Sequence, residues 1–343
     1  MVLMSEPMPA HDRESFLVTG ALGCIGSWVL KQLVGARVPV VAYDRHGASM
    51  HRAHLVMTPE ELGNVEFVSG DVLDKDDLQK AVLAHGVTHV VHLAALQVPF
   101  VKADPMQGAL VNVVGTTAVF EVARDLGSQI AGLVYASSAA VWGSPAAYPP
   151  GPLSDDATPK PTTLYGVFKL ANEGTAVIYW QDHGVASIGL RPNVVWGPGR
   201  DQGFTSPPSK ALLAAAVGRP YHMAWGGRSG LHYAPDVAAH FVRAVRACAN
   251  GAESFDLGGP FVHMKEFTEL IEHAVPEARG TITYDRGDFP QVELSGHRFE
   301  ARLGPADWTP METAVRSSVS QFRDAASRGD LDVDAILDGG GRP

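Results

Sequence analysis

The stretch that decides the fold is Phe16-Leu-Val-Thr-Gly20-Ala-Leu-Gly23-Cys-Ile-Gly26, an apolar run followed by three glycines spaced three apart. The apolar run predicts a buried strand, and glycine lets the chain turn tightly and approach a ligand closely. A helix beginning near Gly23 would present free amide groups to an anion such as a diphosphate. Any strand-to-helix turn favours glycine, so the loop alone is also compatible with an ordinary connection.

A second apolar run, residues 38–44, ends in an acid, Asp44. It follows Gly20 at close to the roughly 20-residue spacing at which a carboxylate binds the ribose of a dinucleotide. Its charge favours NAD over NADP because it repels a 2′-phosphate, whereas the adjacent Arg45 would pair with that phosphate. An acid at a strand end can also simply solvate a turn. We expect an NAD site that includes Gly20, Gly23, Cys24, Ile25, Gly26, Asp44 and Arg45.

The composition of the chain excludes several functional classes. Its 343 residues are 45% hydrophobic, enough for one or two closely joined globular domains with a large core. The formal net charge of −10 argues against a nucleic-acid surface, which needs positive charge. Two cysteines allow neither a disulfide framework nor a zinc motif, so we expect a cytoplasmic protein without a metal. No apolar run reaches the roughly 18 residues needed to cross a bilayer, so we expect no membrane partner.

Short apolar runs alternate with helical patterns through the first half of the chain. The strands are expected at residues 15–20, 38–44, 65–71, 89–95, 132–138 and 186–192, and the helices near 23–34, 74–84, 104–126 and 162–183. The strands show little alternation of apolar and polar residues, which is typical of a parallel sheet buried on both faces. This predicts an α/β fold, a Rossmann-type doubly wound parallel sheet, with a smaller α/β substrate-binding lobe towards the C-terminal end.

Proline- and glycine-rich loops after residue 192 mark the second lobe. A helix at 236–249 and a strand at 254–257 are expected to return to the main sheet. The domain prediction is therefore an NAD-binding domain of residues 15–192 plus 232–257, and a substrate-binding lobe of residues 193–231 plus 258–328. Residues 1–14 and 329–343 are expected to be loose tails.

Three residues in the predicted α/β domain suit proton transfer coupled to redox chemistry. Tyr165 and Lys169 lie four apart in a helical stretch, so they project from one face. A neighbouring ammonium and a cationic nicotinamide both favour phenolate, so Tyr165 could exchange a proton with a substrate hydroxyl. Ser138, at the exit of a predicted strand, could hold the reacting oxygen. A tyrosine and a lysine four apart are common by chance, and the combination of all three carries the hypothesis.

These motifs together resemble an extended short-chain dehydrogenase/reductase of the NAD-dependent epimerase/dehydratase family, from Phe16 to about Arg323. The matching segments are 19–26, Asp44, 70–72, 92–95, 112–116, 137–138, the Tyr165 and Lys169 pair, 191–192 and 236–238. The resemblance implies that Asp71 and Val72 hold the adenine and that Leu93, Ala94 and Ala95 line the cofactor path. It also implies NAD contacts from Asn112, Lys169 and Pro192. The implied activity is an interconversion of alcohol and carbonyl on a carbohydrate-like substrate, and the implied assembly is a homodimer.

The chain departs from the family pattern where nucleotide-sugar members bind the substrate diphosphate. Val194 stands in place of the usual Asn, with Asn193 one position earlier, and Ser229 stands in place of the usual Arg, with Arg228 one position earlier. The dehydratase members have Thr-Asp-Glu where this chain has Ser138-Ala-Ala, which argues against dehydration. We therefore expect a free sugar, sugar acid or polyol as substrate. The expected contacts are Gln97, Ser138, Ala139, Trp142, Tyr165, Asn193, Arg200, Arg228 and His232.

Two other functions remain open from the sequence. An epimerase that retains its NAD, including one acting on a nucleotide sugar, would use the same three catalytic residues. A non-catalytic protein that senses NAD would need only the cofactor site. Trp142 and Trp196, which replace tyrosines common in the family, could shape the pocket or fill the space between the lobes.

Overall fold

The computed structural model describes residues 14–248, 250–287, 289 and 291–339. Its centre is a seven-stranded parallel sheet with the order β10-β6-β5-β4-β1-β2-β3, which confirms the predicted doubly wound fold. The strands are β1 (Phe16–Thr19), β2 (Val40–Asp44), β3 (Glu66–Ser69), β4 (His89–His92), β5 (Gly132–Ala136), β6 (Ser187–Arg191) and β10 (Ala252–Asp256). The expected strand at 254–257 thus does return to the sheet, as β10.

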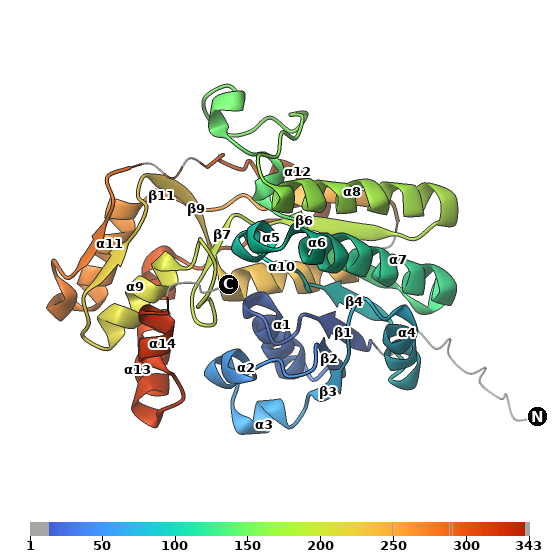
Figure 1. The fold of residues 1–343 in the computed structure, drawn as a ribbon, viewed down its shortest axis with the longest axis horizontal. Helices are drawn as coiled ribbons and strands as arrows, with labels where there is room; N and C mark the ends of the chain where they lie inside the picture. The colour runs from blue at the N-terminus through green and yellow to red at the C-terminus, as the bar shows by residue number, and fades with distance from the viewer. Residues whose placement is uncertain (1–13, 249, 288, 290, 340–343) are drawn as a thin grey trace, which may run out of the picture.

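Helices cover both faces of this sheet (Figure 1). Along β1, Phe16 and Val18 pack into one apolar cluster and Leu17 into the other, because successive strand residues point to opposite faces. The first cluster includes α1 (Cys24–Gly35) and α10 (Ala234–Arg246). The second includes α4 (Lys75–Ala84), α7 (Gly115–Leu126) and α8 (Leu164–His183). The burial of both faces explains the apolar runs of the inner strands β1, β2 and β5, whereas the edge strand β3 is largely exposed.

The helix expected at 104–126 contains a change of helix type. It runs as α6 (Pro105–Ala109), a π-helical segment over Leu110–Val114, and α7. Within the π segment, the Asn112 amide forms two hydrogen bonds with the backbone of Leu96, of 2.7 and 2.9 Å. The continuous helical run 105–129 is long and apolar enough to cross a membrane by length and composition alone, but half of its most apolar 18-residue stretch is buried inside the fold. A core helix of an α/β domain meets the same criteria.

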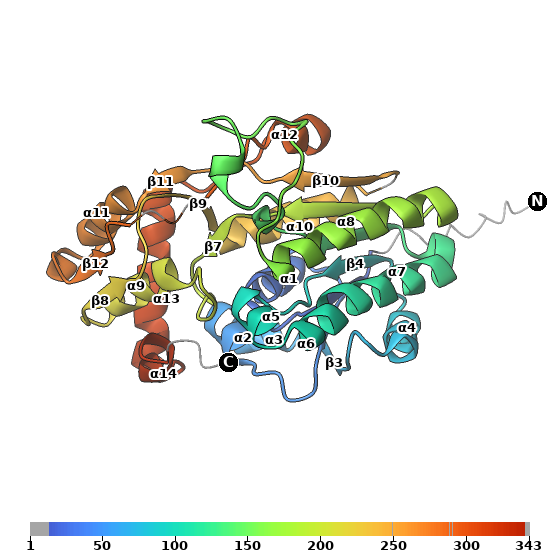
Figure 2. The same cartoon turned by 45° about the horizontal axis from the view of Figure 1, so that its top comes forward.

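The second lobe lies beside the carboxyl end of the sheet (Figure 2). Its strands are β7 (Val194–Trp196), β9 (Arg228–Tyr233) and β11 (Phe261–His263) in one sheet, and β8 (Tyr221–Met223) and β12 (Ile282–Tyr284) in another. Its helices are α9 (Pro207–Ala216), α11 (Met264–Ala274) and α13 (Met311–Arg328), whereas α12 (His297–Leu303) packs against β10 of the main sheet. Trp196 is fully buried between Tyr233 and Phe267, so it fills the core of this lobe.

Part of the C-terminal segment that we expected to be a loose tail is ordered. Val333–Leu337 forms α14, with Leu337 buried. Arg219, which follows α9, binds Asp334 at 2.6 Å and Asp338 at 3.0 Å. The apolar contact and these ion pairs hold the segment against α9, an arrangement that its polar sequence did not indicate. Residues 1–13 and 340–343 of the expected tails lie outside the described residues.

Candidate active site

The glycine-rich loop between β1 and α1 has no room for a side chain at Gly20 or Gly26. Gly20 has φ +66°, and a Cβ there would lie 2.7 Å from the backbone nitrogen of Ala94. A Cβ on Gly26 would clash with the carbonyl oxygen of Gly20. Gly23 caps α1, whose first amide groups have no partner from a capping side chain. The loop therefore has the close backbone approach and the helix N-terminus that a dinucleotide diphosphate requires.

Cys24 and Ile25, which lie between Gly23 and Gly26, are partly buried. Ile25 packs against the core, and Cys24 lies beside Gly199, where a Cβ would be 3.8 Å from the Cys24 Cα atom. Burial raises the pKa of the Cys24 thiol to about 11, so the side chain remains a neutral thiol at physiological pH.

Asp44, at the end of β2, is oriented by a hydrogen bond from the glycine-rich loop. Its Oδ2 accepts a hydrogen bond from the Leu22 backbone at 2.8 Å, and its Oδ1 accepts one from the backbone of Arg45. The Arg45 residue itself is exposed. The bond to Leu22 fixes the carboxylate relative to the glycines. It could not be predicted from the sequence, because a backbone donor has no sequence signature.

The residues that the resemblance assigns to the adenine and to the cofactor path follow β3 and β4, respectively. Asp71, after β3, is exposed and accepts from the Leu73 backbone, while Val72 is buried against Gly115 of α7. After β4, Leu93, Ala94 and Ala95 are partly buried. Asn112 is fully buried and holds the backbone of Leu96, so its side chain supports this segment and is not free to contact a cofactor.

His92 lies beneath the same segment and is a structural residue. Its ring nitrogens bond to the hydroxyls of Thr19, at 2.7 Å, and Thr116, at 3.0 Å. Burial, and then the positive charge of Lys169, lower the pKa of His92 to about 3, so the ring stays neutral. Among the residues that the structure describes, no group of three His, Cys, Asp or Glu side chains could hold a metal ion.

The three predicted catalytic residues come together at the carboxyl edge of the sheet. Ser138 follows β5, and Tyr165 and Lys169 lie on the first turns of α8. The Lys169 ammonium lies 5.6 Å from the centre of the Tyr165 ring and donates to the carbonyl of Ala136 at 2.6 Å. The backbone of Ala139 donates to the carbonyl of Pro192 at 3.0 Å, which joins the exits of β5 and β6.

The environment shifts the pKa values of both titratable members of this trio. Burial raises the pKa of the Tyr165 phenol, while a hydrogen bond with Ser138 and the charge of Arg200 oppose that increase. Burial lowers the pKa of Lys169 to about 8, opposed by the carboxylate of Glu173. Ser138 and Arg200 therefore both favour the phenolate that proton transfer from a substrate would require.

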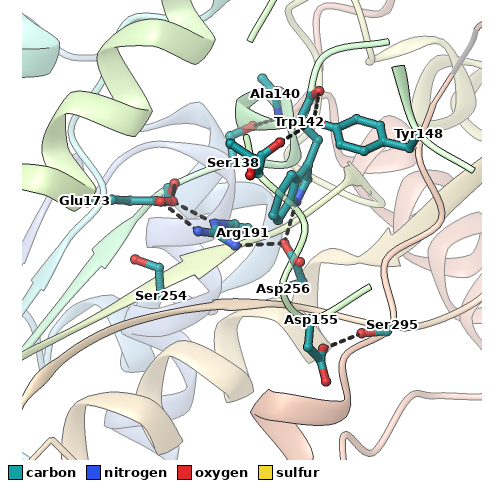
Figure 3. Close-up of polar contacts among 12 residues, drawn as sticks. Ser138, Ala140, Trp142, Tyr148, Asp155, Glu173, Arg191, Ser254, Asp256 and Ser295 are labelled. Carbon is teal, nitrogen blue, oxygen red and sulfur yellow. Dashed lines mark hydrogen bonds and ion pairs between the residues drawn. The ribbon is translucent and has the colours of Figure 1, made fainter. Parts of the chain in front are cut away.

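A buried chain of charged groups lies next to the trio (Figure 3). The Arg191 guanidinium makes two 2.7 Å bonds to Glu173 and lies 3.5 Å from Asp256. Glu173 also accepts from Ser137, and Asp256 accepts from the Trp142 indole at 2.8 Å. Trp142 is buried among Val141, Leu153, Val292 and Leu294, so it fills the space between the lobes and does not line an open pocket. Glu173 was not among the predicted site residues, although its spacing of four from Lys169 placed it on the same helix face.

Of the remaining predicted substrate contacts, the structure brings Gln97 and Arg200 together. Both lie against Gly203, where a Cβ would clash with Gln97 Oε1 and lie 3.2 Å from Arg200 Nη2. Gln97 directly precedes α5 (Val98–Ala103), and Arg200 lies in the loop between β7 and α9.

The other three predicted contacts are engaged elsewhere, which corrects the prediction. Arg228 is exposed and donates to the carbonyl of Phe261 on β11 at 2.6 Å. His232 is buried against Trp308 and accepts a hydrogen bond from the Asn193 backbone; burial lowers its pKa to about 3. The Asn193 amide donates to the carbonyl of Val292.

Comparison with known proteins places the chain in a family. The family model for NAD dependent epimerase/dehydratase proteins matches residues 16–258. The chain belongs to the NAD-dependent epimerase/dehydratase family. It is 31% identical over 319 residues to UDP-glucose 4-epimerase of Mycolicibacterium smegmatis, covering 90% of this chain and 98% of that protein. It is 32% identical over 187 residues to UDP-glucuronate 4-epimerase 4 of Arabidopsis thaliana, covering 53% and 42%.

Solved structures with the same fold include both epimerases and dehydrogenases. UDP-glucose 4-epimerase of Thermus thermophilus in complex with NAD aligns with a TM-score of 0.75 and 24% identity, over 91% of this chain and 99% of that one. L-threonine dehydrogenase from Clostridium difficile aligns with a TM-score of 0.76 and 20% identity, over 91% and 98%. The family is NAD-dependent, and the closed glycine loop with Asp44 fits that cofactor. The chain is an NAD-dependent enzyme of the dehydrogenase or epimerase type.

Asp44 offers a test of cofactor choice. Asp44→Asn keeps an oxygen that can accept from the Leu22 backbone but removes the charge that repels a 2′-phosphate. We expect the preference for NAD over NADP to narrow by about tenfold in this variant, as measured by fluorescence titration. Asp44→Ala also loses the bond to the loop and should weaken both cofactors. Equal affinities of the wild-type protein for NAD and NADP would contradict this role of Asp44.

Proposed function

We propose that this enzyme interconverts a secondary alcohol and a ketone on a free sugar, sugar acid or polyol. The trio at the sheet edge supports the chemistry. The Tyr165 oxygen takes the proton of the substrate hydroxyl, or returns it in reduction, and Ser138 holds the same substrate oxygen against the phenol. NAD, which the glycine-rich loop and Asp44 would hold, would supply the acceptor for the hydride of the carbinol carbon. Lys169, held by Ala136 and close to the ring, stabilises the phenolate electrostatically.

The burial of Val194 and Ser229 supports the proposal that the substrate has no nucleoside diphosphate. Val194 is buried in β7, and Ser229 is fully buried with its hydroxyl donated to Gln291 at 2.6 Å. Neither neighbour replaces the missing ligands, because Asn193 is bonded to Val292 and Arg228 is turned towards β11. An apolar side chain cannot satisfy a phosphate oxygen, so a diphosphate would lose contacts that nucleotide-sugar members of the family make.

A UDP-sugar 4-epimerase is the second candidate. The similarity to the Mycolicibacterium epimerase extends over nearly the whole length of both chains. An epimerase would use the same trio to oxidise a sugar carbon, and would return the hydride to the other face of the ketone from NAD that it keeps bound. Net NADH formation separates the two candidates, since epimerisation leaves NAD unchanged at the end of each turnover.

Replacing the proposed acid/base tests the mechanism common to both candidates. Tyr165→Phe keeps the ring but removes the proton-carrying oxygen, so we expect turnover to fall by about 10²–10⁴-fold. NAD affinity should stay within about twofold, because the ring packing is retained. Tyr179→Phe, the same change further along α8, removes a hydroxyl bonded to Glu121 and should keep its activity. Steady-state rates above half of wild type for Tyr165→Phe would rule out the assignment.

Competition by nucleotide sugars tests the substrate class. UDP-glucose and UDP-glucuronate should neither be turned over nor raise the melting temperature of the NAD-bound protein, whereas NAD itself should raise that of the free protein. The measurements are thermal unfolding and NADH absorbance across a panel of sugars, sugar acids and polyols. Micromolar binding of either UDP sugar would support the epimerase instead.

We also propose that the protein is a homodimer formed through α8 and the helical run 105–129. Exposed apolar residues line one face of each helix. On the run, Met106, Leu110 and Val114 lie four apart, and on α8, Leu164 and Val167 lie three apart, with Ile178 about three turns further along. The two helices pack side by side, with α6, α7 and α8 on the same side of the sheet in Figure 1. Two such helices paired with their counterparts would remove a continuous apolar surface from water.

The double change Val114→Glu and Ile178→Glu would place four carboxylates in that interface. We expect the wild-type protein to scatter light as a dimer at micromolar concentration and the double variant to scatter as a monomer. Leu83→Glu, which changes an equally exposed leucine on α4, serves as the control and should leave the dimer intact. A monomeric wild-type protein would contradict the proposal.

A cytoplasmic location is part of the same proposal. Cys24 and Cys248 are both free, and burial raises the pKa of each thiol to about 11. Thiols held in the neutral form suit a reducing compartment, where no disulfide is required.

A further inference from the structure

Arg200 is a cation without a matching anion. Its Nη2 donates to the Thr205 hydroxyl at 2.8 Å, and its Nε is enclosed with no acceptor. Within the described part of the chain, no carboxylate forms an ion pair with it. The adjacent carboxylate, Asp201, is bound instead by Arg52, at 2.8 and 2.9 Å, and by His51. A guanidinium stays charged at neutral pH, and its burial is costly until an anion pairs with it.

Gln97, close to Arg200, has a buried hydrogen-bond acceptor without a donor. Its Oε1 is enclosed and has no donor among the described residues. A Cβ on Gly203 would contact both Gln97 Oε1 and Arg200 Nη2, so the unmet acceptor lies close to the guanidinium that carries the unmet Nε donor. A ligand that offers an oxygen anion to Arg200 and a hydroxyl hydrogen to Gln97 would satisfy both.

This part of the structure adjoins the helix that carries Tyr165, because α5, which follows Gln97, packs against α8. The charge of Arg200 also acts to lower the pKa of the Tyr165 phenol, against the larger effect of burial. On the other side, the loop of Arg200 touches the glycine-rich loop, where a Cβ on Gly199 would lie 3.8 Å from Cys24. Two oxyanions could therefore reach Arg200, a carboxylate on the substrate or the diphosphate of NAD. A diphosphate has no hydrogen for Gln97 Oε1, whereas a hydroxy acid has both groups.

The loop that carries Arg200 is anchored before any ligand binds. Arg52 and His51, at the start of α2 (His51–Val56), hold Asp201, and the Trp28 indole donates to the carbonyl of Pro198 at 2.9 Å. These contacts fix the backbone on both sides of Arg200. An anchored loop makes binding stronger, because less freedom is lost when the ligand arrives.

We propose that Arg200, Thr205 and Gln97 form an oxyanion subsite that binds the carboxylate of a hydroxy-acid substrate and places its secondary alcohol at Tyr165. The proposal rests on the proposed oxidoreductase function and adds the substrate class, a sugar acid in which the carboxylate lies near the oxidised carbon. In this proposal Arg200 selects substrates that carry a carboxylate. Tyr165 and Ser138 cannot make that selection, because they contact only the reacting oxygen.

The test uses matched acid and neutral probes on the NAD-bound protein. The pairs are gluconate with glucitol, galacturonate with galactose, and UDP-glucuronate with UDP-glucose, each differing in a carboxylate. Dissociation constants come from calorimetry, and NAD affinity is measured separately by fluorescence. The variants are Arg200→Gln and Gln97→Glu, which places a carboxylate beside the guanidinium. Arg316→Gln, on the surface of α13 and paired with Glu312, is the control.

We expect at least one acid to bind about tenfold or more tightly than its neutral partner, as one charge-assisted contact provides. Arg200→Gln and Gln97→Glu should both abolish that difference with NAD affinity unchanged, and Arg316→Gln should preserve it. The subsite is overturned if the wild-type protein prefers no acid, if the preference survives Arg200→Gln, or if Arg200→Gln weakens NAD instead. The UDP pair distinguishes failure of the proposed function from failure of the subsite. Binding of both UDP sugars refutes the free-sugar function, whereas the ratio of their dissociation constants still tests whether Arg200 binds the carboxylate.

Discussion

The buried ion pair between Glu173 and Arg191 is the interaction on which the active site depends. Through it, α8 is joined to β6, and further bonds reach Ser137 at the end of β5 and Asp256 at the end of β10. Each of these elements delivers a part of the site to the same edge of the sheet. Lys169 lies one turn before Glu173, and Ser138 directly follows Ser137. A change in the pair would therefore move the phenol and the ammonium on α8 relative to the Ser138 hydroxyl that follows β5.

The energetics of this pair make it rigid. Removing two charges from water is expensive, and the cost is recovered only when the geometry is good and the remaining polar atoms are satisfied. Here the guanidinium makes two short bonds to one carboxylate and lies over the Trp142 ring, 4.8 Å from its centre. Burial raises the pKa of the second carboxylate, Asp256, while Arg191 and the Trp142 indole oppose that increase. Loss of one partner from such a pair costs about 3–5 kcal/mol, because a buried charge is left unpaired.

The parts of the structure that could be predicted from the sequence are those set by local rules. Glycine spacing, an acid at a strand end and a helical spacing of four each involve a few neighbouring residues, so β1, Asp44 and the Tyr165 and Lys169 pair could be located. The substrate contacts depend on the tertiary structure. Arg228 and Ser229 are neighbours in β9 and point to opposite faces, and only the pairing of β9 with β11 and β7 determines which one is buried. The role of Asn112 likewise depends on the path of residues 93–97, which no local pattern specifies.

The short segment that leaves β2 connects the two loops of the site. At its start, Asp44 binds the backbone of Leu22 in the glycine-rich loop, and at its end, His51 and Arg52 bind Asp201 beside Arg200. Both contacts involve charged groups in partly buried places, where electrostatic interactions are stronger than in water. One piece of chain thus contains Asp44, the proposed ligand of the cofactor ribose, and binds Asp201, the neighbour of the proposed substrate ligand Arg200. The positions of the cofactor loop and the substrate loop are consequently not independent, although residues 20–26 and 197–206 are far apart in the sequence.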